Sequence, residues 1–327
     1  MCKVSIALSV YNVVEYVRAT IDCILEQSFR DFELLCIDDA STDGTWEVLQ
    51  EYANNDNRVR LIRQHTNRGL SVSRNIAIAE ARGDYLLMID GDDLFARNVV
   101  EKAYHKAQET DADMVIWDYS VFYGDDINSL CINASSLKGI TLLDKISLIK
   151  RPAFVWTRLL KLDVLRRLGV YFPEGLTKQD IPVHWKLITS LDKIAVIPER
   201  LSFYRQQPNS TSNKNDESLF SLALVMDIVG NQLRDDGIYH IYRNEYLRSR
   251  LSLLYGMYDH VKADLKEDAL VIVKKRLGND EIEYIHEPGN ELSRNARWFY
   301  LMLEGNKLAH MKNICYRFIR TIYRKLR

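Results

Sequence analysis

The chain has 327 residues, 47% hydrophobic and 27% charged, which is typical of a folded protein with one large or two small domains. Its net charge of −1 gives no reason to expect nucleic acid as a partner. The five cysteines are odd in number and lack metal-ligand spacing, so they are interpreted as free thiols in a reducing compartment. With no signal-peptide cleavage site and no apolar run near the ~18 residues that span a bilayer, the sequence predicts a cytoplasmic protein.

The first hundred residues predict alternating strands and helices. Short apolar runs predict buried strands at 4–10, 32–37, 59–62 and 85–89. Helical spacing of apolar residues and turn signals between these runs predict helices that begin near residues 14, 45 and 71. This alternation predicts an α/β fold, a mostly parallel sheet with helices on both faces.

The chain after residue 150 has a different character. All six prolines lie there, and the segment 151–212 is expected to be rich in loops. From about Asp216 the pattern predicts helix after helix. The predicted organisation is therefore a domain at 1–212 and a helical C-terminal region at 213–327.

Carboxylates follow two of the predicted strands. Asp38 and Asp39 end one strand, and Asp90-Gly91-Asp92-Asp93 ends another. In parallel sheets ligands bind beyond the carboxyl ends of the strands, so these residues are expected to converge. Three crowded carboxylates repel one another unless a cation lies between them, and Mg²⁺ or Mn²⁺ prefers such oxygen ligands. The alternative is a solvated Asp-rich turn, but the strand context favours a metal site.

Four motifs occur in a fixed order along this half of the chain. They are Val10-Tyr11-Asn12, the stretch 38–45, the stretch Asn67-Arg68-Gly69-Leu70-Ser71-Val72-Ser73-Arg74-Asn75, and Asp90-Gly91-Asp92-Asp93. Together they resemble family 2 glycosyltransferases of the GT-A (Rossmann-like) fold, closely over residues 3–125 and more loosely over 150–212. One departure is Ser9, where the family usually has proline.

The resemblance implies a nucleotide-sugar half at 1–125 and an acceptor half at 150–212. Within the first half, it implies roles for residues around the nucleotide sugar, which is expected to be a UDP-sugar. Asp39 would accept a hydrogen bond from the base, Asp90 would lie near the ribose, and Asp92 would ligate Mn²⁺ or Mg²⁺. The other implied donor-binding residues are Val10, Tyr11, Asn12, Arg74 and Gly91. For Arg74 the alternative is an ion pair with a nearby aspartate.

The stretch 172–181 resembles the acceptor-side segment of the same family, where a Glu-Asp pair usually stands. Here Gln179 replaces the glutamate and Asp180 remains. Asp180 is assigned as the base that takes a proton from the acceptor hydroxyl in an inverting displacement. The alternative for Asp180 is a helix N-cap or first-turn aspartate.

Four further residues are candidates for contact with acceptor or phosphate, namely Gln179, His184, Arg205 and Trp156. His184 follows Asp180 at i+4, so the two would share a helix face. For His184 and Trp156 the alternative is packing in the core. Arg205 lies in the segment 198–212, which resembles the family's donor-closing loop; its alternative is a surface arginine.

The C-terminal tail, residues 306–327, predicts a basic amphipathic helix. Apolar residues recur at three- and four-residue steps, at Leu308, Met311, Cys315, Phe318, Ile322 and Leu326. Lysines and arginines lie between them, and no acidic residue follows Glu304. Such a helix suits peripheral binding to an anionic membrane at its inner, cytoplasmic face. The alternative is a terminal helix docked on its own domain.

These expectations amount to an inverting, metal-dependent glycosyltransferase that acts on a glycan or lipid-linked glycan in surface polysaccharide biosynthesis. The acceptor rests on the resemblance alone. Two alternatives stay open. A nucleotidyltransferase or sugar-phosphate pyrophosphorylase usually has a glycine-rich loop after its first strand, and residues 9–14 contain no glycine. An inactive scaffold relative is supported only by Gln179 and Ser9.

Overall fold

The computed structural model describes residues 2–124, 137, 144–206 and 214–305. The chain divides into two compact units, residues 1–213 and 214–327. The predicted amphipathic tail at 306–327 and part of the predicted donor-closing loop, 207–212, lie outside the described residues.

The first unit is built on a single mixed sheet with the strand order β3-β2-β1-β4-β7-β6-β8-β5. The strands are β1 (Val4–Val10), β2 (Phe32–Asp38), β3 (Val59–Arg63), β4 (Tyr85–Asp90), β5 (Leu94–Phe95), β6 (Met114–Tyr123), β7 (Arg158–Lys161) and β8 (Ile194–Gln206). β1 pairs in parallel with β2 and β4, and β2 with β3, so their carboxyl ends share one edge.

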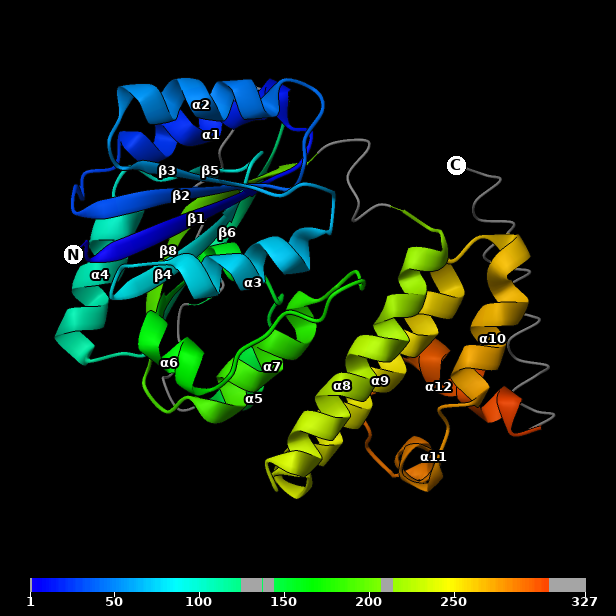
Figure 1. Cartoon of the computed structure of the whole chain (residues 1–327). Coiled ribbons are helices and arrows are strands. Elements are labelled where there is room, and N and C mark those ends of the chain that lie inside the picture. Colours follow the sequence, from blue (N-terminus) through cyan, green and yellow to red (C-terminus); the bar gives the residue numbers. More distant parts are fainter. Residues whose placement is uncertain (1, 125–136, 138–143, 207–213, 306–327) are drawn as a thin grey trace. The chain divides into compact units, whose positions relative to one another are not determined.

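Helices cover both faces of this sheet, as the alternating pattern predicted. They are α1 (Val14–Leu25), α2 (Thr45–Asn55), α3 (Leu70–Glu80), α4 (Val99–Thr110), α5 (Lys145–Ile149), α6 (Leu162–Arg167) and α7 (Asp180–Ser190). The apolar faces of α1, α2 and α4 pack with alternate residues of β1 in one core. Figure 1 shows α1 and α2 on one side of the sheet and α3 and α6 on the other.

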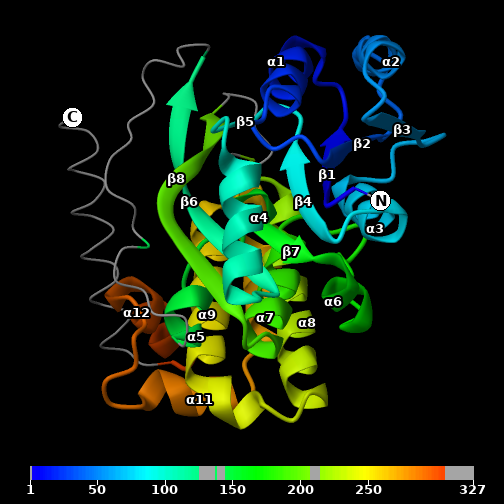
Figure 2. The ribbon, with the colours of Figure 1, turned by 90° about the vertical axis from the view of Figure 1, so that its left-hand side faces the viewer.

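The second half of the sheet was not predicted. The expected loop-rich segment 151–212 contains β7, α6, α7 and the long strand β8. β7 runs antiparallel between β4 and β6, and β8 pairs in parallel with β6, as Figure 2 shows. Residues 198–206, expected in a closing loop, therefore lie in β8. Long-range pairing holds these segments as strands, and local sequence does not reveal it.

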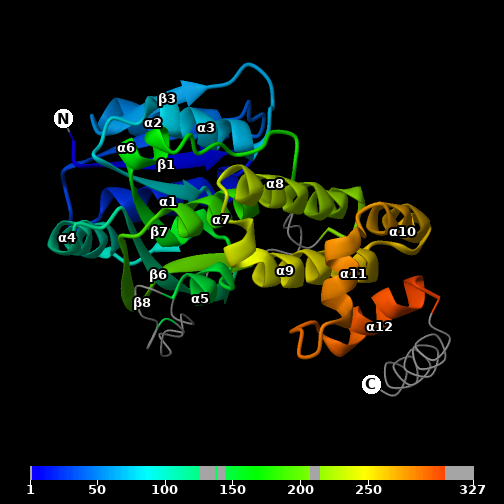
Figure 3. The same ribbon diagram turned by 90° about the horizontal axis from the view of Figure 1, so that it is seen from below.

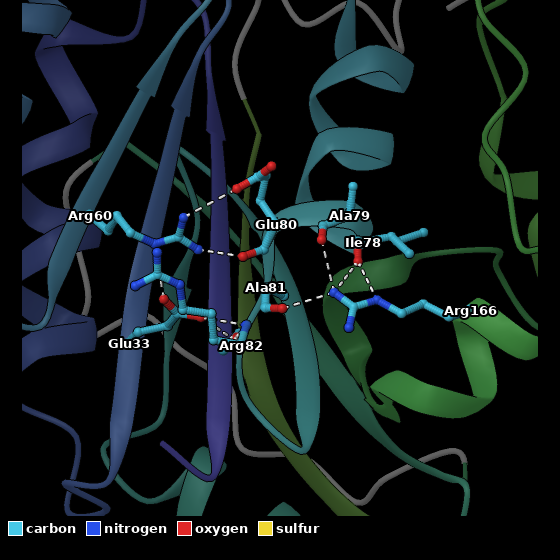
Figure 4. Close-up of polar contacts among 9 residues, drawn as sticks. Glu33, Arg60, Ile78, Ala79, Glu80, Ala81, Arg82 and Arg166 are labelled. Atoms are coloured by element: carbon cyan, nitrogen blue, oxygen red, sulfur yellow. Dashed lines mark hydrogen bonds and ion pairs between the residues drawn. The ribbon is translucent and has the colours of Figure 1, made fainter. Parts of the chain in front are cut away.

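Helix α3 is anchored firmly at its C-terminal end. The guanidinium of Arg166 donates hydrogen bonds to the carbonyl oxygens of Ile78, Ala79 and Ala81 at 2.8–3.0 Å, and Arg60 binds the carbonyl of Glu80 (Figure 4). A cation at this position satisfies the carbonyl groups that a helix leaves without an intrahelical partner. These contacts fix the helix that carries Arg74.

The second unit is helical in its described part. Its helices are α8 (Ser221–Asp235), α9 (Tyr239–His260), α10 (Lys266–Lys274), α11 (Asn279–His286) and α12 (Arg294–Leu303). α8 and α9 lie side by side, and the Tyr246 hydroxyl of α9 donates to the carbonyl of Met226 in α8 (Figure 3). No helix within the described ranges is long and apolar enough to cross a membrane.

Candidate active site

The end of β1 is tied to the loop after β2. Asn12 has a positive φ of 52°, its backbone N–H donates to Ser41 Oγ at 3.0 Å, and its Oδ1 accepts from the backbone N–H of Thr42 at 2.8 Å. These bonds stabilise a conformation that non-glycine residues seldom adopt. Val10 is buried and its carbonyl oxygen accepts from the backbone N–H of Asp39 at 2.9 Å, whereas Tyr11 is 46% exposed. Tyr11 is thus the side chain that this strand end offers.

Asp39 organises the loop that precedes α3. Its Oδ1 accepts from Gln64 Nε2 and the backbone N–H of Arg68, both at 2.8 Å, and its Oδ2 accepts from the backbone N–H of Gly69 at 2.7 Å. Asp39 is only 3% exposed. Both carboxylate oxygens therefore accept hydrogen bonds from the loop that precedes α3. Gln64 was not predicted as a site residue, because a glutamine after a strand carries no distinctive signal.

Gly91 leaves no space for a side chain. A Cβ at this position would lie 2.8 Å from Val10 Cγ1 and 3.0 Å from Val13 Cγ2. Such distances are shorter than normal carbon contacts, so any other residue would force the turn away from β1. The acidic turn is thus packed tightly against the end of the first strand.

Burial and mutual repulsion perturb two aspartates of the turn. Burial, together with the neighbouring Asp90, raises the pKa of Asp92 to about 6. Burial and the charges of Asp92 and Asp90 raise the pKa of Asp93 well above its ordinary value. Among the described residues nothing donates a hydrogen bond to the buried Asp93 Oδ2. A cation beside Asp92 would lower the energy of the ionised turn.

Arg205 makes hydrogen bonds to two residues of the acidic turn. Its backbone N–H donates to Asp93 Oδ1 and its Nε to the carbonyl oxygen of Asp92, both at 3.0 Å. The guanidinium carbon lies 5.0 Å from the ring centroid of Tyr16 and 4.6 Å from that of Phe122. Arg205 is 4% exposed, so the surface-arginine alternative is wrong. Its side chain positions the turn's backbone.

Arg74 joins the end of β4 to the start of α7. Its Nη2 donates to Asp90 Oδ1 at 3.0 Å and Oδ2 at 3.3 Å, and its Nη1 pairs with Asp180 Oδ1. Arg74 is 2% exposed, whereas the side chains of Asp90 and Asp180 are 27% and 23% exposed. The structure therefore shows the ion pair with a nearby aspartate that was the alternative role of Arg74. Asp180 is also the first residue of α7, as its alternative required.

The loop before α7 is attached to α3 by side chains of the third motif. Asn75 Nδ2 donates to the carbonyl of Phe172 at 3.0 Å, and Asn75 Oδ1 accepts from the Phe172 N–H at 2.8 Å. Ser71 Oγ donates to the carbonyl of Pro173 at 2.8 Å. No role at the site was predicted for these two polar residues. They set the distance between the acidic turn and Asp180.

Comparisons with known proteins identify what this chain is similar to. Residues 5–130 match the profile described as Glycosyl transferase family 2. The chain is 27% identical over 245 residues to Glycosyltransferase GlyG of Streptococcus pneumoniae, covering 69% of this chain and 77% of the relative. Residues 5–130 of this chain therefore belong to glycosyl transferase family 2. Several other curated glycosyltransferases are matched over less than two thirds of their length.

The fold of this glycosyltransferase is also similar to that of solved structures. S. aureus TarS 1-349, solved in complex with UDP-GlcNAc, superposes with a TM-score of 0.61 at 17% identity, over 93% of this chain and 92% of that one. A Pyrobaculum calidifontis mannosyltransferase, solved with GDP-Man and Mn²⁺, gives a TM-score of 0.51 at 16% identity, over 86% and 83%. The expected GT-A fold with a helical C-terminal part is confirmed.

His184 of the glycosyltransferase lies in the core and offers nothing to a ligand. Its Nδ1 lies 3.2 Å from Arg158 Nη2 and its Nε2 3.2 Å from the carbonyl oxygen of Ile149. Burial, together with the charge of Arg158, lowers the pKa of His184 to about 3. The ring is therefore neutral, with Nε2 donating and Nδ1 accepting. The prediction that His184 contacts acceptor or phosphate is corrected to the core alternative.

Two other acceptor candidates of the enzyme are buried as well. Trp156 is 3% exposed, and its ring stacks between Phe154 at 4.7 Å and Tyr204 at 5.4 Å. Trp156 therefore packs in the core, which was the alternative to contact with acceptor or phosphate. Gln179 is 7% exposed at the N-cap position of α7, so it presents little surface to an acceptor. Sequence pattern identifies aromatic and polar residue types, but burial depends on packing that only the fold reveals.

Proposed function

We propose that this chain is an inverting, metal-dependent enzyme that transfers a sugar from a nucleotide sugar to a hydroxyl of a glycan or lipid-linked glycan. The observation that carries the proposal is the contact of one buried arginine with two carboxylates. Arg74 touches Asp90, beside the predicted metal ligand, and Asp180, the predicted base. A donor site and an acceptor base must lie this close for a single displacement. We take residues 1–212 as the domain that performs it.

The donor is proposed to be a UDP-sugar. The solved structures of similar fold were determined with UDP-GlcNAc in one case and GDP-Man in another, which supports a nucleotide sugar as a class. Uracil rather than guanine rests on the family resemblance of the segment around Asp39. The exposed ring of Tyr11 at the end of β1 is available to pack against the nucleotide.

The residues of the acidic turn fit a divalent cation. Asp92 is the proposed protein ligand, because its carboxyl group is crowded by Asp90 and partly withdrawn from water. No group of three His, Cys, Asp or Glu side chains suited to a metal occurs in the described ranges. Mg²⁺ is often held by one or two carboxylates plus substrate phosphates, so such a group is not required. When bound, Mn²⁺ or Mg²⁺ would offset charge on the leaving diphosphate.

Asp180 is proposed to act as the base. The acceptor oxygen attacks the anomeric carbon and forms the new glycosidic bond as the bond to the diphosphate breaks. Asp180 receives the hydroxyl proton, and the nucleoside diphosphate departs with the bonding electrons. Attack opposite the leaving group inverts the anomeric centre. Proton transfer to a positioned carboxylate would contribute about 10²–10⁴ in rate.

The acceptor is proposed to be a growing surface polysaccharide or lipid-linked glycan, reached at the cytoplasmic face of the membrane. This part rests on the family resemblance and on the basic pattern of residues 306–327. Co-sedimentation of the full chain with anionic vesicles, compared with a chain that ends at Gly305, tests the membrane contact. Loss of binding on deletion is expected, and equal binding by both chains would remove the tail from this role.

A thermal-shift screen of nucleotide sugars tests the function. UDP-sugars with Mn²⁺ should raise the melting temperature, and Asp92→Asn should abolish the Mn²⁺-dependent part. Transfer or slow donor hydrolysis with Mn²⁺ should follow for the same sugar. If no nucleotide sugar and no metal binds, the chain is a scaffold relative. If the protein instead releases pyrophosphate from a nucleoside triphosphate and a sugar phosphate, it is a nucleotidyltransferase.

A further inference from the structure

We infer that Arg74 is the positioning residue of the proposed base, which it aligns and keeps ionised from the donor side of the site. This inference rests on the proposed function and deepens it. The sequence resemblance implied only that Arg74 holds the nucleotide. The contacts of its side chain point instead to Asp180.

The guanidinium of Arg74 is committed to two carboxylates through different nitrogens. Nη1 pairs with Asp180, and Nη2 donates to both oxygens of Asp90. The guanidinium carbon also lies 5.6 Å from the ring centroid of Phe172, whose backbone is held by Asn75. A planar fork with fixed donors sets the direction of a carboxylate as well as its distance, which a lysine cannot do.

The proposed base, Asp180, needs a positively charged partner because its carboxyl group is partly withdrawn from water. Burial raises the pKa of Asp180, and the charge of Asp90 on β4 acts in the same direction, whereas Arg74 on α3 and Arg158 on β7 lower it. Arg158 has other hydrogen-bond partners, the carbonyl of Phe154 through Nε and His184 through Nη2. Among the residues that the structure describes, Arg74 is the cation paired directly with Asp180. Without it, a partly buried carboxylate near another carboxylate would favour its protonated, inactive form.

The position of Arg74 is rigid for reasons outside the site. Ser71 and Asn75 bind the backbone of residues 172–173 on one side of α3, and Arg166 binds the carbonyls at its C-terminal end (Figure 4). The arginine is therefore held by the same helix that holds the loop leading to Asp180. Arg166 also supplies a matched control, because it is an arginine that fixes α3 without touching either carboxylate.

The test compares Arg74→Gln, Arg74→Lys and the control Arg166→Gln in the full chain. The readouts are the pH dependence of kcat/KM for transfer and the affinity for UDP in the presence of Mn²⁺, with circular dichroism to verify folding. In Arg74→Gln the acid limb of this profile, where kcat/KM falls as the pH is lowered, should move to higher pH by at least one unit. At neutral pH kcat should fall at least tenfold. Affinity for UDP should change less than tenfold.

Arg74→Lys should restore part of the acid limb, because a lysine keeps the charge but not the fork. Arg166→Gln should lower thermal stability and leave the acid limb in place. An unmoved limb in folded Arg74→Gln, with UDP affinity reduced instead, would overturn the inference and leave Arg74 as a nucleotide ligand. Absence of transfer by the wild-type protein with every donor would contradict the proposed function itself. Should Arg74→Gln not fold, an unmoved limb in Arg74→Lys with normal kcat would also overturn the inference.

Discussion

Replacement of His184 by glutamine should remove a pH-dependent loss of stability. His184 is 4% exposed, and its two ring nitrogens contact Arg158 and the carbonyl of Ile149. In the folded state its pKa is lowered to about 3, from an ordinary value of 6.5, by burial and by the charge of Arg158. Below pH 6.5 the imidazole of His184 therefore binds a proton in the unfolded chain but not in the folded chain. Stability is complete above pH 6.5 and is lost as the pH falls toward 3.

The size of the effect follows from the two pKa values. Between pH 7.5 and pH 5, one histidine that titrates only in the unfolded state costs about 2 kcal/mol of unfolding free energy. Other groups also titrate over this range, so the informative quantity is the difference between the wild-type protein and His184→Gln. That difference should shift by about 2 kcal/mol in favour of the variant as the pH is lowered.

Urea unfolding at the two pH values measures this difference. Tryptophan fluorescence is a suitable probe, because Trp117, Trp156 and Trp185 are all buried in the same unit as His184. His65→Gln provides a matched control, because it replaces a histidine whose side chain is exposed rather than packed in the core. Equal pH dependence in the wild-type protein and His184→Gln would refute a buried neutral imidazole, and would return His184 to the candidates for ligand contact.

Three further predictions concern the site. Asp180→Asn should lower transfer by about 10²–10⁴ while leaving UDP affinity within a few-fold, and retained turnover would remove Asp180 from the role of base. Gly91→Ala should destabilise the protein by about 1–3 kcal/mol in urea unfolding, because its Cβ would lie 2.8 Å from Val10 Cγ1. Asn75→Ala should cost about 1–3 kcal/mol, since both Phe172 backbone groups lose a partner, and hydrogen exchange at Phe172 should quicken.

The first half of the sheet could be predicted almost residue by residue. The strands expected at 4–10, 32–37, 59–62 and 85–89 end within one residue of those observed. Continuous apolar runs separated by helical periods are a local signal, because each buried parallel strand must be apolar on both faces. The polar residues after these strands could be assigned to one edge for the same reason, since parallel strands end together.

The acceptor half was less predictable because its order comes from partners distant in sequence. β7 lies between β4 and β6 although about 70 residues separate it from the former, and its four residues carry no periodic signal of their own. β8 contains Pro198 and several charged residues, which led to the expectation of a loop. Pairing with β6 overrides that local preference.

By itself, the amino-acid sequence determined the class of fold, the acidic turn and the family, because each depends on residue types at short, fixed spacing. Only the tertiary structure decided which side chains are available for chemistry. His184, Trp156 and Arg205 have suitable residue types, yet packing places all three in the interior. Arg74 and Asp180 are 106 positions apart, and no local pattern links them. They meet because α3 holds both the arginine and the loop that leads to the base.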